Sequence, residues 1–303
     1  MPDPTEPVLT GGFAAAVVLF CVGAAIRAYT AARPPVPPVP GVSPDDEASP
    51  YAPPPLPPEF HAGKVPVWIY RHSDLFGVVF VFAVFFGLVL ASVRAAESVA
   101  SPLEPGTLLV NIGFQFLMAG MVVVLMVRRL DVLTWLGLRW HGWPRVFLIA
   151  PGTVLFMWLI FGGLQVSGYV EWMESLGVET VQDTVKLLQD SQDPQVLGLM
   201  AFAAVIAAPL CEEIVFRGYF YPVLKKFAGV RAAALSSSLV FAAAHGNLAA
   251  LLPLFIFGGV LVFLYEKTGS LWAPIGAHFC FNSATVVLQM AARYYEIPLA
   301  PTP

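Results

Sequence analysis

Residues 74–93 read DLFGVVFVFAVFFGLVLASV, and Asp74 is the single charged residue among these twenty positions. A helix of about twenty apolar residues crosses a hydrocarbon core roughly 30 Å thick. Seven further apolar stretches lie at residues 8–29, 107–127, 145–166, 196–215, 232–247, 249–265 and 271–292. The sequence therefore predicts an all-α fold, a polytopic membrane bundle of about eight transmembrane helices.

The composition of the whole chain excludes several classes of protein. Of its 303 residues, 57% are hydrophobic and 12% are charged, whereas soluble domains carry roughly 25% charged residues. The net charge of −4 argues against a nucleic-acid partner, because nucleic-acid-binding proteins present a basic surface. The three cysteines, Cys21, Cys211 and Cys280, lie within apolar stretches and predict no disulfide framework.

The charged loops orient the predicted helices. Basic residues gather near 128–145, near 217–231 and at Lys267, and an excess of Lys and Arg is typical of cytoplasmic loops. The acidic segment 169–195 falls on the opposite side. Within it, apolar residues recur at the spacing of an amphipathic surface helix: Val178, Val181, Val185 and Leu188.

The composition also divides the chain into six segments. Thirteen prolines lie between Arg33 and Pro66, and proline favours an extended tether without internal hydrogen bonds. The predicted segments are an N-terminal transmembrane helix (1–29), a Pro-rich linker (30–67), transmembrane helices 2–4 (68–168), an acidic amphipathic loop (169–195), a transmembrane domain rich in polar residues (196–292) and a C-terminal tail (293–303).

Polar residues within the apolar stretches are concentrated in the last third of the chain. They occur in CEEIVFRG (211–218), FAAAH (241–245) and HFCFN (278–282). An ionisable side chain at bilayer depth costs at least about 2.5–3.5 kcal/mol, so each one indicates a function and a partner. The clustering of these groups predicts a polar site within the bundle.

The spacing in the first of these segments separates its two acids. Glu213 and Arg217 are four residues apart and share a helical face, where an ion pair can form. Glu212 then projects about 100° away from Glu213 and remains available for another role. We interpret Glu213 and Arg217 as a structural ion pair. We interpret Glu212 as a catalytic residue, since no cation shares its helical face.

The other two segments add two imidazoles and an amide. His278 and Asn282 are four residues apart, so both side chains project from one face of a helix. Phe241 stands one turn before His245 and is expected to shield that imidazole from lipid. Three helices therefore offer a carboxylate, two imidazoles and a carboxamide to one interior.

This set of groups suits water activation combined with stabilisation of an oxyanion. Burial raises the pKa of a carboxyl group, which makes the carboxylate a competent general base near neutral pH. An imidazole beside it can share the protons of the water. A second imidazole and an amide can donate hydrogen bonds to the oxygen that becomes negative when a carbonyl is attacked.

EExxxR, FxxxH and HxxxN in this order resemble the three signature motifs of the CPBP family. This family comprises the type II CAAX prenyl endopeptidases and the Abi-like proteins that process bacteriocins or confer immunity to them. The residues Arg217-Gly218-Tyr219 and Thr268-Gly269-Ser270-Leu271 with Pro274 also resemble the family pattern. The resemblance covers about residues 196–290, roughly a third of the chain.

The resemblance implies an intramembrane endopeptidase that acts on a membrane-associated peptide or protein. In the family, the first glutamate of motif one and the histidine of motif two activate water, which assigns these roles to Glu212 and His245. The histidine and asparagine of motif three form the oxyanion site, here His278 and Asn282. Glu213, Arg217 and Phe241 are expected to support the site or to steer a substrate carboxylate.

The sequence leaves the catalytic type open. Glu212, His245 and His278 could together bind a divalent metal such as zinc, as His₂Glu sites do in water-activating enzymes. Nothing in the chain resembles HExxH, the helical motif of zinc proteases. A mechanism without a cofactor is preferred, because it explains His278 and Asn282 as hydrogen-bond donors.

Two other functions compete with proteolysis. A non-catalytic membrane scaffold or bacteriocin-immunity protein would keep the fold, and a proton-coupled transporter would use the acid and the histidines as a relay. We expect an integral multi-pass protein of a bacterial plasma membrane, with its active site in the cytoplasmic half. The substrate is expected to be CAAX-like or a leader peptide.

Two packing features complete the expectations. Aromatic residues near the predicted helix ends are interpreted as an interfacial belt: Trp68, Tyr70, Trp135, Trp140, Trp143, Tyr294 and Tyr295. The pair Gly258-Gly259 is interpreted as a point of close helix packing.

Overall fold

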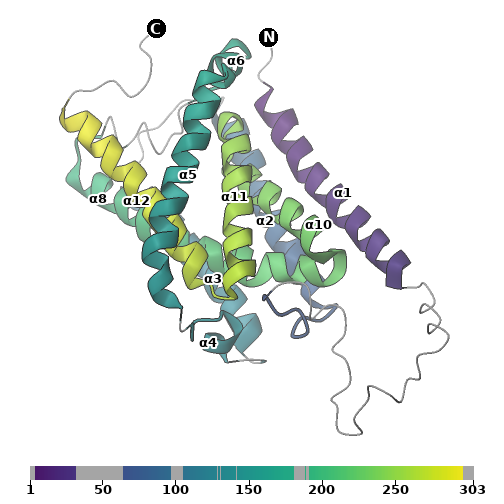
Figure 1. The fold of residues 1–303 in the computed structure, drawn as a ribbon. Helices are drawn as coiled ribbons and strands as arrows, with labels where there is room; N and C mark the ends of the chain where they lie inside the picture. The colour runs from purple at the N-terminus through teal and green to yellow at the C-terminus, as the bar shows by residue number, and fades with distance from the viewer. Residues whose placement is uncertain are drawn as a thin grey trace, which may run out of the picture.

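The computed structural model describes residues 4–31, 64–96, 105–127, 129, 131–140, 142–180, 188 and 191–295. All regular structure within these ranges is helical, which confirms the predicted all-α bundle (Figure 1). Seven described helical stretches are long and apolar enough to cross a membrane. They contain α1 (Thr5–Ala31), α2 (Asp74–Ala96), α3 (Pro105–Val127), α5 (Val146–Val166), the run from Pro194 to Ala243, α11 (Leu248–Thr268) and α12 (Trp272–Tyr294).

The run from Pro194 to Ala243 is 50 residues long, enough for two crossings. It comprises α8 (Pro194–Phe202), η3 (Ala203–Ala207), α9 (Ala208–Glu212), η4 (Glu213–Phe220) and α10 (Tyr221–Ala243). The sequence predicts two separate spans here, 196–215 and 232–247. The structure instead continues the helix and breaks it at Gly229, whose φ of 79° places it in the left-handed region that glycine tolerates.

The segments η3 and η4 are π-helices. Such turns use hydrogen bonds from residue i to i+5 and occur often at functional sites. Pro209 supplies a local cause for η3, because proline has no N–H to donate to the carbonyl four residues earlier. The second π-helix, η4, begins at Glu213 and therefore carries the first of the three polar segments.

Helix α11 stands in the middle of the bundle, with α5 and α12 on one side and α10 and α1 on the other (Figure 1). The N-terminal helix α1 packs closely against α10 through small residues. A Cβ on Gly23 would lie 2.3 Å from the Cβ of Ala232 and 2.9 Å from the carbonyl oxygen of Ala228. The predicted first span is therefore an integral part of the bundle.

Residues 64–70, KVPVWIY, form a strap that docks onto the end of the bundle where α10 begins. Val65, Val67 and Ile69 are buried, and Trp68 points outward with 57% of its surface exposed. Two lysines of α10 hold the main chain of the strap: Lys225 donates to the Val65 carbonyl at 2.9 Å and Lys226 to the Tyr70 carbonyl at 2.5 Å.

The strap corrects one prediction from the aromatic residues. Tyr70 and Trp135 are each only 2% exposed, so they do not belong to an interfacial belt. Trp68, Trp143, Tyr294 and Tyr295 are exposed, as expected of belt residues. Tyr70 and Trp135 are internal because their polar atoms find partners inside the protein, and an interfacial ring needs water or lipid headgroups for this purpose.

Two predicted elements fall mainly on residues outside the described ranges. These are the Pro-rich linker, except for the strap residues 64–67, and the amphipathic helix of the acidic loop. Val178 and Leu188, which border that helix, are both buried. The short elements α4 (Val132–Trp135), η2 (Trp143–Arg145) and α6 (Tyr169–Ser175) lie in the connections between the long helices.

Candidate active site

Glu213 and Arg217 lie on the π-helix η4 and are fully buried. Nη1 of Arg217 donates to Oε1 of Glu213 at 3.0 Å, which confirms the predicted ion pair. Nη2 of the same guanidinium donates to the Gly258 carbonyl in α11 at 3.2 Å. Removing one partner from a buried pair leaves an uncompensated charge, so this contact ties η4 firmly to α11.

His278 reaches the same carboxylate from α12. Its Nδ1 lies 2.9 Å from Oε1 of Glu213, and the ring is 3% exposed. A carboxylate can only accept hydrogen bonds, so Nδ1 of His278 carries a proton and donates. This contact was not predicted, because spacing rules apply within one helix and these residues are 65 positions apart.

Aromatic rings enclose the cluster formed by Glu213, Arg217 and His278. The Phe241 ring lies 4.3 Å from the guanidinium carbon of Arg217 and 6.0 Å from the His278 ring, measured to the ring centroids. The Phe257 ring packs edge-on against His278 at 5.2 Å. These walls exclude lipid and water, which strengthens the electrostatic interactions among the enclosed charges.

Glu212 differs from its neighbour Glu213 in its partners. It is half-buried, and its Oε2 has no hydrogen-bond partner among the described residues. It interacts electrostatically with His278, Glu213 and Arg217, so it lies beside the cluster. A carboxylate that is buried without a hydrogen bond is costly, and catalytic groups are a common reason to retain one.

His245 follows α10, in the short connection to α11, and its side chain is exposed. Its ring packs on Phe241 at 4.9 Å and interacts electrostatically with Arg217. Phe241 covers one side of the ring and leaves the rest exposed, so the expected shielding from lipid is incomplete. Its Nδ1 lies 2.8 Å from the Phe241 carbonyl oxygen. Because a carbonyl can only accept, Nδ1 carries the proton, and in the neutral ring Nε2 is free to take another.

Asn282 occupies the same face of α12 as His278 but bonds elsewhere. Its Nδ2 donates to the Ala204 carbonyl in η3 at 2.7 Å. One of the two amide hydrogens is thus used to hold the first π-helix, and the other remains to donate. The structure therefore joins Glu213, Arg217 and His278 by direct bonds and places Glu212, His245 and Asn282 around them.

The alternative metal set, Glu212, His245 and His278, does not come together as a ligand group. Within the described ranges, no three His, Cys, Asp or Glu side chains are arranged to hold a metal ion. Nδ1 of His278 contacts Glu213, and Nδ1 of His245 contacts a carbonyl oxygen, so Nε2 is the nitrogen that each ring has left for another partner.

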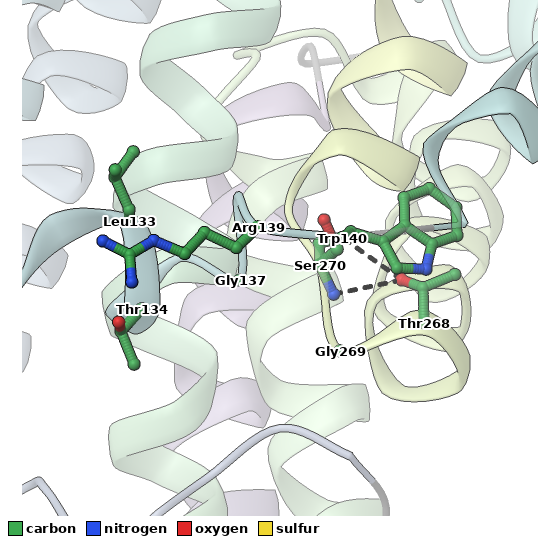
Figure 2. Close-up of a pocket in the computed structure, with 8 residues that line it drawn as sticks. All are labelled: Leu133, Thr134, Gly137, Arg139, Trp140, Thr268, Gly269 and Ser270. Carbon is green, nitrogen blue, oxygen red and sulfur yellow. Dashed lines mark hydrogen bonds between the residues drawn. The ribbon is translucent and has the colours of Figure 1, made fainter.

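Two cavities lie near the ends of these helices. One, of about 310 Å³, is lined by residues of the 133–140 connection and by Thr268, Gly269 and Ser270. Figure 2 shows the Arg139 guanidinium turned toward Leu133 and Thr134, away from Trp140 and Thr268. Polar side chains that line this cavity already have partners. Thr268 forms hydrogen bonds with Ser270, and Arg139 forms an ion pair with Asp131 at 3.5 Å.

The second cavity is larger, about 690 Å³, and its lining is apolar. It lies between α5, η3–α9 and α12. Leu210 in its wall precedes Glu212 by two positions, and Phe279 in its wall follows His278 directly. It therefore runs beside the candidate site on the side of α5.

Comparisons with known proteins agree with the motifs. Residues 194–284 match the family of type II CAAX prenyl endopeptidase Rce1-like proteins. A protein of Bacillus subtilis (strain 168) named "Putative membrane peptidase YdiL" is 34% identical over 96 residues. That match covers 32% of this chain and 39% of the relative's length. No solved structure matches the chain significantly.

The fold and the buried polar cluster define a polytopic membrane protein with a site inside its bundle. Within that class, residues 194–284 are similar to type II CAAX prenyl endopeptidase Rce1-like proteins. Every member of the site lies inside this segment. Helices α1, α2, α3 and α5 lie outside it.

Three contacts of the site were not foreseen from the sequence. They are the bond between Glu213 and His278, the Gly258 carbonyl that accepts from Arg217, and the Phe257 ring against His278. The pair Gly258-Gly259 had indicated close helix packing at the place where Arg217 contacts the Gly258 carbonyl. A Cβ on Gly258 would meet Ser238 at 3.0 Å, whereas Gly259 has open space around it.

Proposed function

We propose that this protein is an intramembrane endopeptidase that hydrolyses a peptide bond of a membrane-associated substrate. The observation that carries the proposal is that two adjacent glutamates differ in their hydrogen-bond partners. Glu213 is bonded to Arg217 and His278, while Oε2 of Glu212 has no partner among the described residues. One acid is suited to hold the site, and the other to act on water.

Glu212 is the general base in this proposal. It takes a proton from a water molecule while the oxygen attacks the peptide carbonyl, a role that typically contributes 10²–10⁴-fold to the rate. It returns this proton to the nitrogen of the leaving amine when the C–N bond breaks, which restores the carboxylate. The free Nε2 of His245 accepts a hydrogen bond from the same water and orients it. Its tautomer suits this role, because the Phe241 carbonyl keeps the proton on Nδ1.

His278 and Asn282 stabilise the oxyanion. This role requires the His278 ring to donate from both nitrogens, with Nδ1 bonded to the Glu213 carboxylate and Nε2 directed at the developing negative oxygen. The remaining amide hydrogen of Asn282 provides a second donor. Loss of one such donor raises the barrier by about 2.7–4 kcal/mol. Arg217 balances the charge of Glu213 and fixes it against α11.

The location of the site is part of the proposal. His278 is six residues beyond the start of α12 at Trp272, a rise of about 9 Å from the end beside Lys267. His245 is two residues from Asn247, whose side chain donates to the Glu179 carbonyl on the acidic side. His278 therefore lies in the half with the basic loops, which we assign to the cytoplasm, and His245 lies toward the acidic side, so the proposed site extends through the middle of the bundle.

The test is cleavage of membrane-tethered reporter peptides, CAAX-like and leader-like, by the purified full chain in lipid vesicles. Glu212→Gln should reduce turnover by at least two orders of magnitude. The melting temperature should stay unchanged, because Oε2 of Glu212 makes no bond to the described residues. Glu6→Gln, which alters an exposed pair with Arg94, is the matched control and should cleave normally.

Several results would contradict the proposal or a part of it. Full turnover by Glu212→Gln would exclude Glu212 as the general base. Full biological complementation by that variant, or failure to trap any peptide with it, would point to a scaffold or immunity protein. Proton flux in sealed vesicles without peptide turnover would point to a transporter. Loss of turnover with a chelator, restored by zinc, would contradict the metal-free mechanism and leave the endopeptidase activity standing.

A further inference from the structure

The π-helix η4 is contacted by residues that lie far outside the matched segment 194–284. Tyr70 of the strap donates its hydroxyl hydrogen to the Gly218 carbonyl at 2.7 Å. Trp135 of α4 donates from Nε1 to the Tyr70 hydroxyl oxygen at 3.0 Å. The two bonds form a chain that runs from α4 through the strap to η4.

The contact point is adjacent to the site. Gly218 directly follows Arg217, whose guanidinium holds Glu213. A Cβ on Gly218 would lie 3.0 Å from the Leu136 side chain, so the absence of a side chain lets the connection after α4 approach the helix closely. The Gly218 carbonyl is therefore a buried acceptor whose partner comes from another part of the chain.

The strap is itself fixed by main-chain contacts. Besides the bonds from Lys225 and Lys226, the Lys64 N–H donates to the Glu266 carbonyl at 3.2 Å. The Glu266 carboxylate in turn accepts from Lys225 and from the Tyr221 hydroxyl. These bonds place Tyr70 independently of the side chains of Val65 and Val67.

Tyr70 remains a donor over the physiological pH range. Its side chain is buried, and burial raises its pKa well above the usual value of a tyrosine. Removing the hydroxyl would leave both the Gly218 carbonyl and the Trp135 Nε1–H without this partner. A buried polar group without a hydrogen-bond partner costs free energy, so the present position of η4 would be destabilised relative to shifted positions.

We propose that Tyr70 is a positioning residue of the site. Through the Gly218 carbonyl it fixes the position of η4, and hence the alignment of Glu213 with His278 and of Glu212 with the reacting carbonyl. This inference rests on the proposed peptidase function for its catalytic consequence. Its structural consequence, the alignment of η4, can be measured without any substrate.

The experiment uses Cys211, a 2% exposed thiol one residue before Glu212, as a local reporter. In the full chain with Cys21→Ser and Cys280→Ser, the rate of Cys211 alkylation by a maleimide is measured in detergent micelles. Tyr70→Phe should raise this rate by about three- to tenfold, the range expected for loss of one hydrogen bond. With a reporter peptide, kcat should fall by a similar factor while KM stays within about twofold.

Matched variants separate positioning from general loosening. Trp135→Phe removes the donor to Tyr70 and should act in the same direction with a smaller effect. Tyr169→Phe removes a hydroxyl outside the strap and η4, bonded to the Ala249 carbonyl at 3.0 Å, and should leave Cys211 alkylation unchanged. Trp68→Phe changes an exposed strap residue and should leave alkylation and turnover unchanged.

An unchanged Cys211 rate in Tyr70→Phe would overturn the proposal, and so would an equal increase in Tyr169→Phe. If the wild-type chain cleaves no reporter, the proposed function fails while the alkylation rates still decide the role of Tyr70. If Tyr70→Phe alters alkylation and KM alone, the effect is on substrate binding and the alignment of the reacting groups is not its cause.

Discussion

The inner and outer helices of the bundle meet the membrane in different ways. In the most apolar part of α11, 56% of the residues are buried, against 39% in the run from Pro194 to Ala243 and 22% in α1, α3, α5 and α12. The helices that carry the site exchange bonds between polar side chains, such as those of Glu213, Arg217 and His278. The outer helices mostly present large apolar side chains outward, for example Leu148 and Val166.

This difference shows how each region is held in place. Lipid tails are as apolar as leucine, so burial of apolar surface does not by itself drive helices together in a membrane. The outer helix α1 relies on close approach through small residues such as Gly23, whereas the inner helices rely on buried polar bonds. Changes of equal chemical size should therefore have unequal effects in the two regions.

The largest difference is expected between two glutamate variants. Glu213→Ala removes the carboxylate that pairs with the buried Arg217 and accepts from His278, and it should cost about 3–5 kcal/mol of unfolding free energy. Glu6→Ala breaks an exposed pair with Arg94 and should cost about 0–1 kcal/mol. Denaturant unfolding in micelles measures both. Equal losses would mean that the inner cluster contributes no more than a surface ion pair.

The contact between α1 and α10 should give the next largest effect. Gly23→Ala places a Cβ 2.3 Å from Ala232 and should cost about 1–3 kcal/mol through overpacking. At Gly11, on the same helix, no atom lies within 4 Å of the position that a Cβ would take. Gly11→Ala is therefore the matched control and should leave the free energy of unfolding unchanged. Thermal melts of the two variants side by side test the comparison, and similar melting temperatures would argue against close packing of α1 on α10.

A smaller effect is expected inside the core at the glycine pair of α11. Gly258→Ala brings a Cβ to 3.0–3.1 Å from Ser238 and should cost roughly 1 kcal/mol, the low end for an added methyl group. It should also lower reporter cleavage, because Phe241 lies 3.3 Å away and borders the site. Gly259→Ala meets open space and should change neither quantity. A loss of cleavage in Gly259→Ala alone would show that Gly259, and not Gly258, is the point of close packing beside the site.

The smallest effect concerns the pH dependence of an outer loop. Hydrogen bonds from the Thr134 hydroxyl and N–H lower the pKa of Asp131, the residue that caps α4. A lowered pKa in the folded state stabilises the fold above the unfolded value of about 3.9, and this contribution is lost as the pH falls through the folded value. Asp131→Asn should therefore melt lower than the wild type at pH 7, with the gap closing below about pH 4. A gap of constant size across this range would show that charge is not involved.

The sequence predicted the long helices well because their signal is local. The predicted ends of α2, α3, α5, α11 and α12 agree with the structure to within three residues. The break at Gly229 was not predicted, because a single glycine in the left-handed region joins two helical segments without a polar loop. The π-helices η3 and η4 were missed for a related reason, since no residue pattern specifies an i to i+5 turn.

The site was predictable in composition and only partly in its contacts. The spacing of Glu213 and Arg217 predicted their ion pair, because i and i+4 residues share a helical face. The bond from His278 to Glu213 depends on how α12 packs against η4, which one sequence does not reveal. The roles of Tyr70 and Trp135 were misread, since an aromatic residue near a helix end looks the same whether it faces lipid or the interior.

The pairing of α1 with α10 bears on the order in which the protein is made. Roughly two hundred residues separate Gly23 from Ala228, which at 5–20 residues per second takes a ribosome about 10–40 s to synthesise. During that interval the glycine-bearing face of α1 has no permanent neighbour and is open to other helices in the same membrane. Packing of α1 against α10 is thus a late step of assembly, and we expect errors of assembly to concentrate at the contact between these two helices.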